Sequence, residues 1–387
     1  MEQVGSITVL GSTGSVGTQA IRAALNLGLA VRALTAGRNV EQMERQARTV
    51  NPELVVMHDR VAAKNLRIRL SDTKTRVAYG REAVREAVLM SDAAVCAVSG
   101  IAALPGVLFA AQSGRRVALA NKEAMVCAGS LIKAAAKESG AMIIPVDSEH
   151  SAIFQCLEGN IDRGEIVKLI LTASGGPFFG KTKAELEKVT AAEALCHPNW
   201  KMGPKISVDS ATMMNKGLEI IEAMRLYDLP RSKISVVIHP ESVIHSLVEY
   251  CDGALLAMLS QPDMRLPIQY ALTYPARRPT QILPLDLASC GLLSFSRPDE
   301  VNFPCLAIAS RVSEEGELHC TAMNAANEAA VGAFLSYRIG FNDIPEIIDA
   351  VLNKIEYPGG DPGLEAVLET DNAARMLAER IIRQRGR

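Results

Sequence analysis

The first third of the chain alternates short apolar runs with segments of helical periodicity. The apolar runs predict strands at residues 7–10, 30–35, 54–57, 93–98, 116–119 and 142–146. The segments between them place apolar residues at helical spacing and predict helices at 14–27, 41–49 and 101–113. Because strands that alternate with helices form βαβ units, we expect an α/β domain with a parallel sheet over residues 1–147.

The middle and the end of the chain follow different patterns. Strands are predicted at 167–173, 234–238, 242–250 and 254–259, with helices at 183–189 and 210–227, so we expect an α+β domain over 148–285. Residues 286–304 have little periodicity and contain several Pro and Gly residues, which indicates a linker. Helical patterns at 322–336, 344–355 and 364–384 predict a small helical domain over 305–387.

Length and charge limit the classes of partner. A chain of 387 residues usually divides into more than one domain. With 41 basic and 43 acidic residues there is no basic excess for a nucleic-acid surface, and no apolar run reaches the roughly 18 residues of a membrane helix. The N-terminus lacks the pattern of a signal peptide, and the eight cysteines include no C-x-x-C pair. We therefore expect a cytoplasmic protein with reduced thiols that binds neither nucleic acid nor membrane.

A glycine-rich segment, GSTGSVG at 11–17, follows the first predicted strand and opens the first predicted helix. Glycines in this place permit a tight turn and close approach of a pyrophosphate, to which the helix N-terminus offers N–H groups. The spacing is G-x-x-G-x-x-G rather than the commoner G-x-G-x-x-G, so an ordinary glycine-rich turn stays an alternative. The strand–turn–helix context favours a Rossmann-like dinucleotide site.

The end of the second predicted strand bears on the choice of cofactor. An NAD enzyme usually places an acidic residue there to bind the ribose 2′-hydroxyl. This chain has Gly37, Arg38 and Asn39 instead. A guanidinium can pair with a 2′-phosphate, which favours NADPH, and a solvated surface arginine is the alternative.

Two carboxylates follow the last strand of the N-terminal block. Asp147 and Glu149 are two residues apart, so in an extended chain both side chains point to the same side. Such a pair suits a hard divalent cation such as Mg²⁺ or Mn²⁺. The alternative is that Asp147 or Ser148 caps a helix that starts near His150.

The long helix of the predicted middle domain carries a second polar group. Asn215, Lys216 and Glu219 stand at i, i+1 and i+4 and share one side of it. Ser210 is expected at the helix start, where hydroxyl and backbone N–H groups bind phosphate. A solvated polar face with a Lys–Glu pair is the alternative. Gly217 costs about 1 kcal/mol relative to alanine inside a helix, so it asks for a reason, and close approach of a ligand would be one.

A loop rich in Pro, Gly and Asn at 197–204 contains the only tryptophan of the chain, Trp200. A large aromatic side chain on a loop can close over a substrate and exclude water. Packing of Trp200 as an anchor for its own loop is the alternative, and the sequence leaves both open.

Together these segments resemble the 1-deoxy-D-xylulose 5-phosphate reductoisomerase family of the non-mevalonate isoprenoid route. The matching stretches are GSTGSVG (11–17), ALANKEAMV (118–126), PVDSEHSAIFQCL (145–157), TASGGPF (172–178), HPNWKMGPKISVDSATMMNKGLEIIEA (197–223), HPESVIHSLVEY (239–250), PDMRLPIQYAL (262–272) and NAANEAAV (324–331). They span nearly the whole chain, and the block at 197–223 is highly specific.

The resemblance implies a role for each matching residue. The metal ligands would be Asp147, Glu149 and Glu219. The substrate contacts would be Ser148, Glu149, Ser174, His197, Ser210, Asn215, Lys216 and Glu219, of which Ser174, Ser210, Asn215 and Lys216 would surround the phosphate. The NADPH contacts would be Thr13, Gly14, Ser15, Val16, Gly37, Arg38, Asn39, Asn121, Glu123 and Gly203. The catalytic residues would be Lys122, Glu149, His197 and Lys216, with Lys122 at the polar end of the substrate. Val16 and Pro204 depart from the family pattern, and Pro204 leaves the electrostatics of the lid open.

The resemblance also implies the reaction. A divalent metal would chelate neighbouring oxygens of the ketose while a carbon–carbon bond breaks and re-forms, and NADPH would reduce the resulting aldehyde to 2-C-methyl-D-erythritol 4-phosphate. The substrate would be a small phosphorylated sugar, and the enzyme a homodimer with residues 239–259 at the interface. Two other classes stay open. A metal-free NADP-dependent dehydrogenase would not need the three carboxylates, and a non-catalytic NADPH-binding sensor could lack Lys216 and Glu219.

Overall fold

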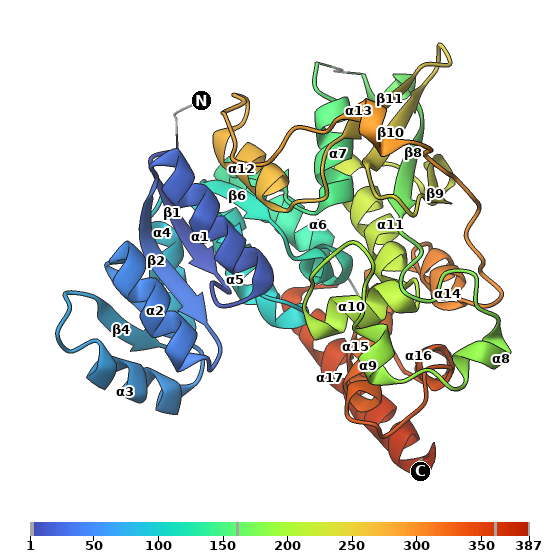
Figure 1. Cartoon of the computed structure of the whole chain (residues 1–387). Coiled ribbons are helices and arrows are strands. Elements are labelled where there is room, and N and C mark those ends of the chain that lie inside the picture. The colour runs from blue at the N-terminus through green and yellow to red at the C-terminus, as the bar shows by residue number, and fades with distance from the viewer. Residues whose placement is uncertain (1–3, 160–161, 360–361, 386–387) are drawn as a thin grey trace. The chain divides into compact units, whose positions relative to one another are not determined.

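The computed structural model describes residues 4–159, 162–359 and 362–385 (Figure 1). The chain divides into two compact units, each assembled from separate segments. Unit 1 comprises Met1–Ala124, Ser130–Ser151 and Asp263–Leu283, and unit 2 comprises Met125–Gly129, Ala152–Pro262 and Pro284–Arg387. The expected functional division into residues 1–147, 148–285, 286–304 and 305–387 stays a prediction.

Unit 1 is built on a seven-stranded sheet in the order β4-β3-β2-β1-β5-β6-β7, in which all neighbours are parallel. The strands are β1 (Ser6–Leu10), β2 (Ala30–Ala36), β3 (Leu54–Met57), β4 (Arg76–Tyr79), β5 (Ala93–Cys96), β6 (Arg116–Leu119) and β7 (Met142–Pro145). The expected parallel sheet is confirmed. The strand order reverses at β1, between β2 and β5, and ligands of such sheets bind at the carboxyl ends of strands near this point.

Helices connect these strands. They are α1 (Ser15–Leu27), α2 (Val40–Val50), α3 (Arg60–Arg69), α4 (Arg81–Leu89), the short η1 (Ile101–Ala103) and α5 (Leu104–Gln112). The long α6 (Lys122–Ser139) begins directly after β6. A segment from far along the chain, α12 (Arg265–Thr273), packs against α1 (Figure 1). The buried side of α1 has small residues such as Gly17, Ala20 and Ala24, which permits close packing of this helix.

Unit 2 contains a four-stranded sheet in the order β11-β10-β8-β9. Its strands are β8 (Ile166–Ala173), β9 (Ile234–Ile238), β10 (Ile244–Tyr250) and β11 (Leu255–Leu259). β10 runs antiparallel to both β8 and β11, and β8 is parallel to β9. The helix α11 (Met214–Tyr227) contacts β8 and β9 and buries most of its residues. The strands expected in the middle of the chain are therefore present.

Further helices follow β7 along the chain. They are α7 (Ser148–Cys156), η2 (Arg163–Glu165), α8 (Lys183–Leu186), α9 (Ala191–Ala194), α10 (Pro204–Ala211), η3 (Arg231–Lys233), α13 (Leu287–Cys290), α14 (Cys305–Val312), α15 (Glu317–Leu335), α16 (Asp343–Leu352) and α17 (Leu364–Arg385). α15 packs against α16 and α17, and α14 packs against α11. Across the described residues, no helix has both the length and the apolar character required to cross a bilayer. All eight cysteines are free thiols.

The single helix expected over residues 210–227 is wrong, because two helices occupy this stretch. α10 ends at Ala211 and α11 begins at Met214. Between them Met213 has a φ of 64°, a left-handed conformation that is uncommon outside glycine. No Gly or Pro marks this break in the sequence. The helical spacing of apolar residues continues through it and therefore predicts one helix. Because of the break, the first turn of α11 starts only one residue before Asn215.

Gly217 is explained by helix packing. A Cβ atom placed on Gly217 would lie 2.4 Å from the Cβ atom of Ala309 in α14, closer than two carbon atoms can approach. Glycine therefore permits α11 and α14 to touch. The reason considered from the sequence, close approach of a ligand, is not needed.

Candidate active site

The turn between β1 and α1 requires its glycines. Gly11 has a φ of 81°, and a Cβ atom there would lie 2.6 Å from the carbonyl oxygen of Ala97. A Cβ atom on Gly17 would lie 2.3 Å from the carbonyl oxygen of Gly11. Gly14 caps α1 without a side-chain hydrogen bond, and no acidic residue occupies the first turn. The N-terminus of α1 thus offers its N–H groups and positive dipole to an anion. The turn holds four of the expected cofactor contacts, Thr13, Gly14, Ser15 and Val16.

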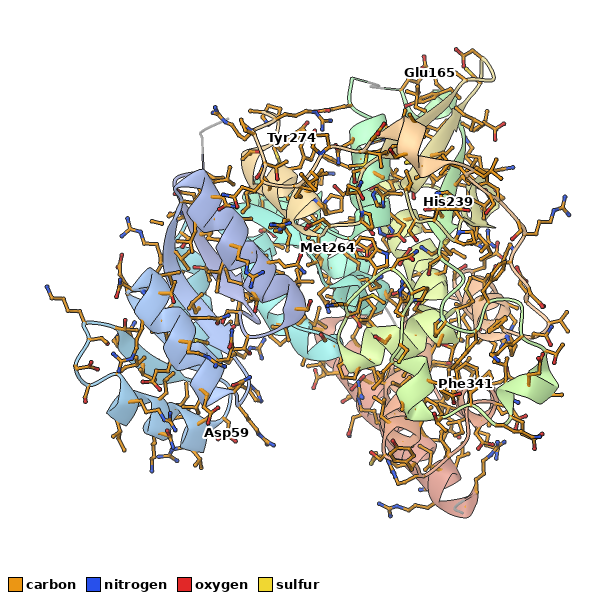
Figure 2. The ribbon with its side chains drawn as sticks, viewed as in Figure 1. Asp59, Glu165, His239, Met264, Tyr274 and Phe341 are labelled. Atoms are coloured by element: carbon orange, nitrogen blue, oxygen red, sulfur yellow. The ribbon has the colours of Figure 1, made fainter. Side chains whose placement is uncertain are left out.

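The carboxyl end of β2 lies beside this turn and holds three more of the expected contacts. The space next to the α-carbon of Gly37 is open, since a Cβ atom there would meet nothing within 4 Å. The side-chain oxygen of Asn39 accepts a hydrogen bond from the backbone N–H of Gln42 and caps α2, a local role that sequence reasoning missed. Arg38 is 85% exposed and forms an ion pair of 3.2 Å between its Nε and Oδ2 of Asp59, a residue labelled in Figure 2.

Asn121 fixes the start of α6. Its Oδ1 accepts from the backbone N–H of Ala124 at 2.8 Å, and its Nδ2 donates to Glu123 at 2.7 Å. The same Nδ2 lies 2.9 Å from the carbonyl oxygen of Val98, in the segment that follows β5. Asn121 therefore joins the carboxyl ends of two neighbouring strands. The next residue, Lys122, is buried and forms an ion pair of 2.7 Å with Asp147.

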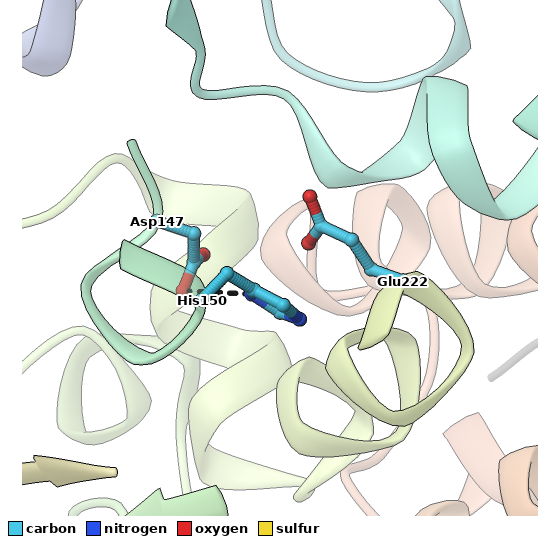
Figure 3. A group of neighbouring side chains, drawn as sticks. All are labelled: Asp147, His150 and Glu222. Carbon is cyan, nitrogen blue, oxygen red and sulfur yellow. Dashed lines mark ion pairs between the residues drawn. The ribbon is translucent and has the colours of Figure 1, made fainter. Parts of the chain in front are cut away.

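Asp147 lies between β7 and α7. Its carbonyl oxygen accepts the backbone N–H of Ser151, and α7 begins at Ser148. The extended geometry expected for residues 147–149 is therefore wrong, because a helix begins at Ser148. The metal role of Asp147 and Glu149 stays a prediction. Oδ1 of Asp147 lies 3.5 Å from Nδ1 of His150 (Figure 3). In the first turn of α7, Ser148 donates a hydrogen bond to Glu149.

The charge on Asp147 is set by its neighbours. Burial by itself would raise the pKa of this carboxyl, but the Lys122 ammonium and the His150 side chain outweigh burial. The pKa of Asp147 consequently lies well below its usual range. An ionised carboxylate at the carboxyl end of a strand is a suitable oxygen ligand for a hard divalent cation.

In unit 2, Ser174 and His197 form a hydrogen-bonded pair with 2.9 Å between Oγ and Nε2. Nδ1 of His197 accepts two backbone N–H groups, from Asn199 at 3.2 Å and from Trp200 at 3.0 Å. A neutral imidazole then carries its hydrogen on Nε2 and donates it to Ser174. Burial lowers the pKa of His197 to about 4, so the neutral form is favoured.

The loop that follows Ser174 lies against the end of α10. Gly176 has a φ of 74°, and a Cβ atom on it would lie 2.6 Å from the carbonyl oxygen of Ser210. Ser210 lies in the last turn of α10, which ends at Ala211. Its expected position at a helix start is therefore wrong. At the other end of α10, Gly203 is the N-cap and Pro204 takes the first helical position, where a missing N–H costs nothing.

Asn215, Lys216 and Glu219 share one side of α11, as expected. Nδ2 of Asn215 donates to Oε1 of Glu219 at 2.5 Å, and Nζ of Lys216 donates to Oε2. Lys216 is 3% and Glu219 0% exposed, which excludes the solvated polar face considered as the alternative. Amide, ammonium and carboxylate are thus held at the N-terminal end of one helix.

Two buried acids, one on α10 and one on α11, escaped sequence reasoning. Glu222, one turn after Glu219 on α11, is 1% exposed and is drawn in Figure 3. Asp209 forms an ion pair of 2.8 Å with Lys205 and accepts a hydrogen bond from Asn327 of α15 at 2.8 Å. The spacing of Glu219 and Glu222 on one helix could have pointed to the first. Nothing local points to the second, because Asn327 is 118 residues away.

Trp200 is half-buried in the loop before α10. Its ring centroid lies 6.3 Å from that of His245 in β10, and its backbone N–H donates to His197. The loop is therefore anchored at this residue, which supports the alternative that the sequence left open, while movement of the loop stays a prediction.

The expected site residues fall into two groups. Unit 1 holds Thr13, Gly14, Ser15, Val16, Gly37, Arg38, Asn39, Asn121, Lys122, Glu123, Asp147, Ser148 and Glu149. Unit 2 holds Ser174, His197, Gly203, Ser210, Asn215, Lys216 and Glu219. Within unit 1 they lie at the carboxyl ends of strands, and within unit 2 they lie around α10 and α11.

Comparison with known proteins gives a consistent result along the chain. Residues 7–129 match a family model described as 1-deoxy-D-xylulose 5-phosphate reductoisomerase. Residues 143–227 and 259–377 match models of C-terminal domains of the same enzyme. The 1-deoxy-D-xylulose 5-phosphate reductoisomerase of Acetivibrio thermocellus is 46% identical over 98% of this chain and 100% of its own length. That of Paraburkholderia xenovorans is 49% identical over 97% of this chain and 95% of its own.

Solved structures agree with these matches. The reductoisomerase from Zymomonas mobilis in complex with NADPH is 42% identical, covers 98% of this chain and 99% of its own, and has a TM-score of 0.90. A DOX-P reductoisomerase in complex with NADPH, fosmidomycin and magnesium is 40% identical, covers 99% of this chain and 98% of its own, and has a TM-score of 0.93.

Proposed function

The chain belongs to the 1-deoxy-D-xylulose 5-phosphate reductoisomerase family, and from this premise we propose which of its residues carry out the reaction. The enzyme converts 1-deoxy-D-xylulose 5-phosphate to 2-C-methyl-D-erythritol 4-phosphate. NADPH supplies the hydride, and a divalent metal ion supplies Lewis acidity at the substrate oxygens. The metal-free dehydrogenase and the non-catalytic sensor are thereby set aside.

The residues of unit 1 suit NADPH. The β1–α1 turn has the two glycines that close packing demands and a helix N-terminus without an acidic side chain. The open space beside Gly37 would admit the adenosine ribose, and Arg38 would pair with the 2′-phosphate. We assign cofactor binding to Thr13, Gly14, Ser15, Val16, Gly37, Arg38, Asn39, Asn121, Glu123 and Gly203.

The acidic residues suit a hard cation. Asp147 is ionised because Lys122 and His150 stabilise its charge, and carboxylate oxygens are the ligands that Mg²⁺ and Mn²⁺ prefer. We assign the metal to Asp147, Glu149 and Glu219. Lys122 would then have a second task, since its ammonium can also stabilise negative charge on the polar end of the substrate.

The phosphate of the substrate would bind to Ser174, Ser210, Asn215 and Lys216. In support, the loop after Ser174 lies against Ser210, and the first turn of α11 presents Asn215 and Lys216. A phosphate held far from the reacting carbons orients them without chemical participation. Ser148, Glu149, His197 and Glu219 would complete the substrate contacts, and Lys122, Glu149, His197 and Lys216 would be the catalytic residues.

We also propose a homodimer in a cytoplasmic setting. β11 is an edge strand of the unit 2 sheet and exposes Leu255 and Leu256, at 54% and 48%. An apolar edge strand is a template for pairing with a second chain, which suits the expected interface at 239–259. The eight free thiols suit a reducing compartment.

The observation that carries the assignment is the buried group of Asn215, Lys216 and Glu219 on α11. The test is product analysis of the full chain with 1-deoxy-D-xylulose 5-phosphate, NADPH and Mn²⁺ or Mg²⁺. We expect one NADPH oxidised per molecule of 2-C-methyl-D-erythritol 4-phosphate formed, and no turnover after chelation of the metal. NADPH oxidation that survives chelation would favour the simple dehydrogenase instead.

A further inference from the structure

Asp59 lies at the cofactor edge of unit 1 without belonging to any of the expected contacts. It stands between β3 and α3, and its backbone N–H donates to the carbonyl oxygen of Gly37 at 3.3 Å. The segment that follows β3 therefore runs beside the segment that follows β2. This adjacency brings Asp59, which Figure 2 labels, next to Arg38.

The two carboxylate oxygens of Asp59 have different partners. Oδ1 accepts the backbone N–H of Ala62 at 2.8 Å and caps α3, which holds the side chain in place. Oδ2 lies 3.2 Å from Nε of Arg38. The hydrogen bond from Ala62 is the main reason that the pKa of Asp59 is lowered, so the carboxylate is charged at neutral pH.

Bound NADPH would offer Arg38 a second anionic partner in place of Asp59. The nucleotide presents a 2′-phosphate with nearly two negative charges, whereas NADH presents a neutral hydroxyl at the same place. The phosphate and Asp59 would compete for one guanidinium. The neighbouring cation Arg60 is engaged elsewhere, with its guanidinium 5.4 Å from the centroid of the Tyr79 ring.

We propose that Asp59 determines nucleotide affinity by holding Arg38 in an ion pair, so that 2′-phosphorylated nucleotides bind more weakly than Arg38 alone would permit. This inference rests on the proposed role of Arg38. Asp59 is a positioning residue in this scheme, because it acts through Arg38 and not on the reacting atoms. Its effect falls on NADPH and NADP⁺ and spares NADH and NAD⁺.

The test is calorimetric titration of the full chain with NADP⁺ and with NAD⁺. Asp59→Asn removes the charge but keeps the cap, because asparagine caps helices as well as aspartate does. We expect NADP⁺ to bind about two- to fivefold more tightly, the range of exposed ion pairs, with NAD⁺ unchanged. The gain should diminish at high salt. Unchanged or weaker NADP⁺ binding overturns the proposal.

Further variants separate the explanations. Arg38→Ala should weaken NADP⁺ binding, and in that background Asp59→Asn should have no effect. If the double variant still gains affinity, Asp59 repels the phosphate directly and the ion-pair mechanism is overturned. If Arg38→Ala alone leaves NADP⁺ binding intact, the proposed role of Arg38 fails. Asp72→Asn, which breaks the comparable exposed pair with Arg48, should change nothing. If Asp59→Asn unfolds the chain, Asp59→Ser offers a second neutral cap.

Discussion

Ser174 and His197 are joined through Oγ and Nε2 at 2.9 Å, and the direction of this hydrogen bond is fixed by the other side of the ring. Because Nδ1 of His197 accepts two backbone N–H groups, Nε2 is the donor. Ser174 also accepts the backbone N–H of Gly176 at 3.2 Å. With two hydrogen bonds accepted, the hydroxyl of Ser174 has its own hydrogen to donate to an anion such as phosphate.

Ser174→Ala should therefore weaken binding of the substrate phosphate. Hydrogen bonds to charged groups contribute about 1.5–3 kcal/mol, so kcat/KM for 1-deoxy-D-xylulose 5-phosphate should fall by about 10- to 100-fold. NADPH binding should be unchanged. Steady-state kinetics with each substrate varied in turn measures both effects, and an unaltered kcat/KM would show that Ser174 does not bind the phosphate.

The pH behaviour of His197 follows from its burial. Its pKa of about 4 in the folded chain lies below the roughly 6.5 of an unfolded chain. The unfolded state therefore binds more protons between these values, and this histidine lowers the free energy of unfolding as the pH falls from about 6.5 towards 4. Nitrogen NMR of labelled histidine should show a neutral ring with hydrogen on Nε2 at pH 6. Titration of His197 near its ordinary pKa would contradict the assignment.

Gly217→Ala should destabilise unit 2 by overpacking. The new methyl group would meet Ala309 at 2.4 Å, and overpacking of this kind costs about 1–3 kcal/mol, although alanine is the better helix former. Denaturant unfolding of both proteins measures the loss. Ala309→Gly in the same chain provides the control, because it removes the opposing methyl group and should recover part of the stability. If Gly217→Ala is neutral, α11 and α14 are not packed as described.

Much of unit 1 could be predicted because β1, β3, β5 and β6 are buried on both faces. Apolar runs predict β1, β3 and β6 to within one residue. The missed strand, β4, lies at the sheet edge and has exposed residues at both ends, so its sequence lacks such a run. The helices α3, α4, α6 and α12 were also missed. In α12, Pro267 falls within the helix and reads as a helix breaker.

In the candidate site, residues that lie close together in the sequence could be grouped, whereas contacts between separate segments could not. Asn215, Lys216 and Glu219 could be grouped from the sequence because helix geometry alone brings them together. The pairing of Ser174 with His197 joins two loops and could not. The break at Met213 could not be predicted, because methionine does not favour the left-handed backbone conformation and only the surrounding structure imposes it.

Trp200 should report on ligand binding, since a single tryptophan gives a local signal. Its backbone N–H contacts His197, whose ring contacts Ser174, so a phosphate bound at Ser174 would act on the same loop. We expect the emission to change when a phosphonate substrate analogue is added with NADPH. Unchanged emission, with binding shown by calorimetry, would leave Trp200 as a fixed anchor and would remove the case for loop closure.

The most demanding test concerns Glu219 and the metal. The carboxylate is fully buried, and both of its oxygens accept hydrogen bonds, from Asn215 and Lys216. A buried ammonium and carboxylate stabilise each other, and carboxylate oxygens are also the ligands that a hard divalent cation prefers. Glu219→Gln keeps the shape and deletes one negative charge. Glu219→Asp keeps the charge and withdraws it by one methylene group.

We expect Glu219→Gln to lose metal affinity and turnover by at least about 10- to 100-fold. Losses of that size follow when residues that only orient the ligands of other metal sites are changed, and loss of a ligand itself should cost no less. NADPH binding should persist, because its assigned contacts lie elsewhere, and this distinguishes a lost metal ligand from a collapsed fold. Activity should be measured against Mg²⁺ and Mn²⁺ concentration in chelator-treated buffer. We expect Glu219→Asp to recover part of its activity at high metal concentration. A compound with a phosphonate at one end and a hydroxamate at the other should inhibit the parent chain more strongly than Glu219→Gln, because the charge that favours a chelated ion is missing from the variant. Full activity of Glu219→Gln without added metal would remove Glu219 from the ligand set.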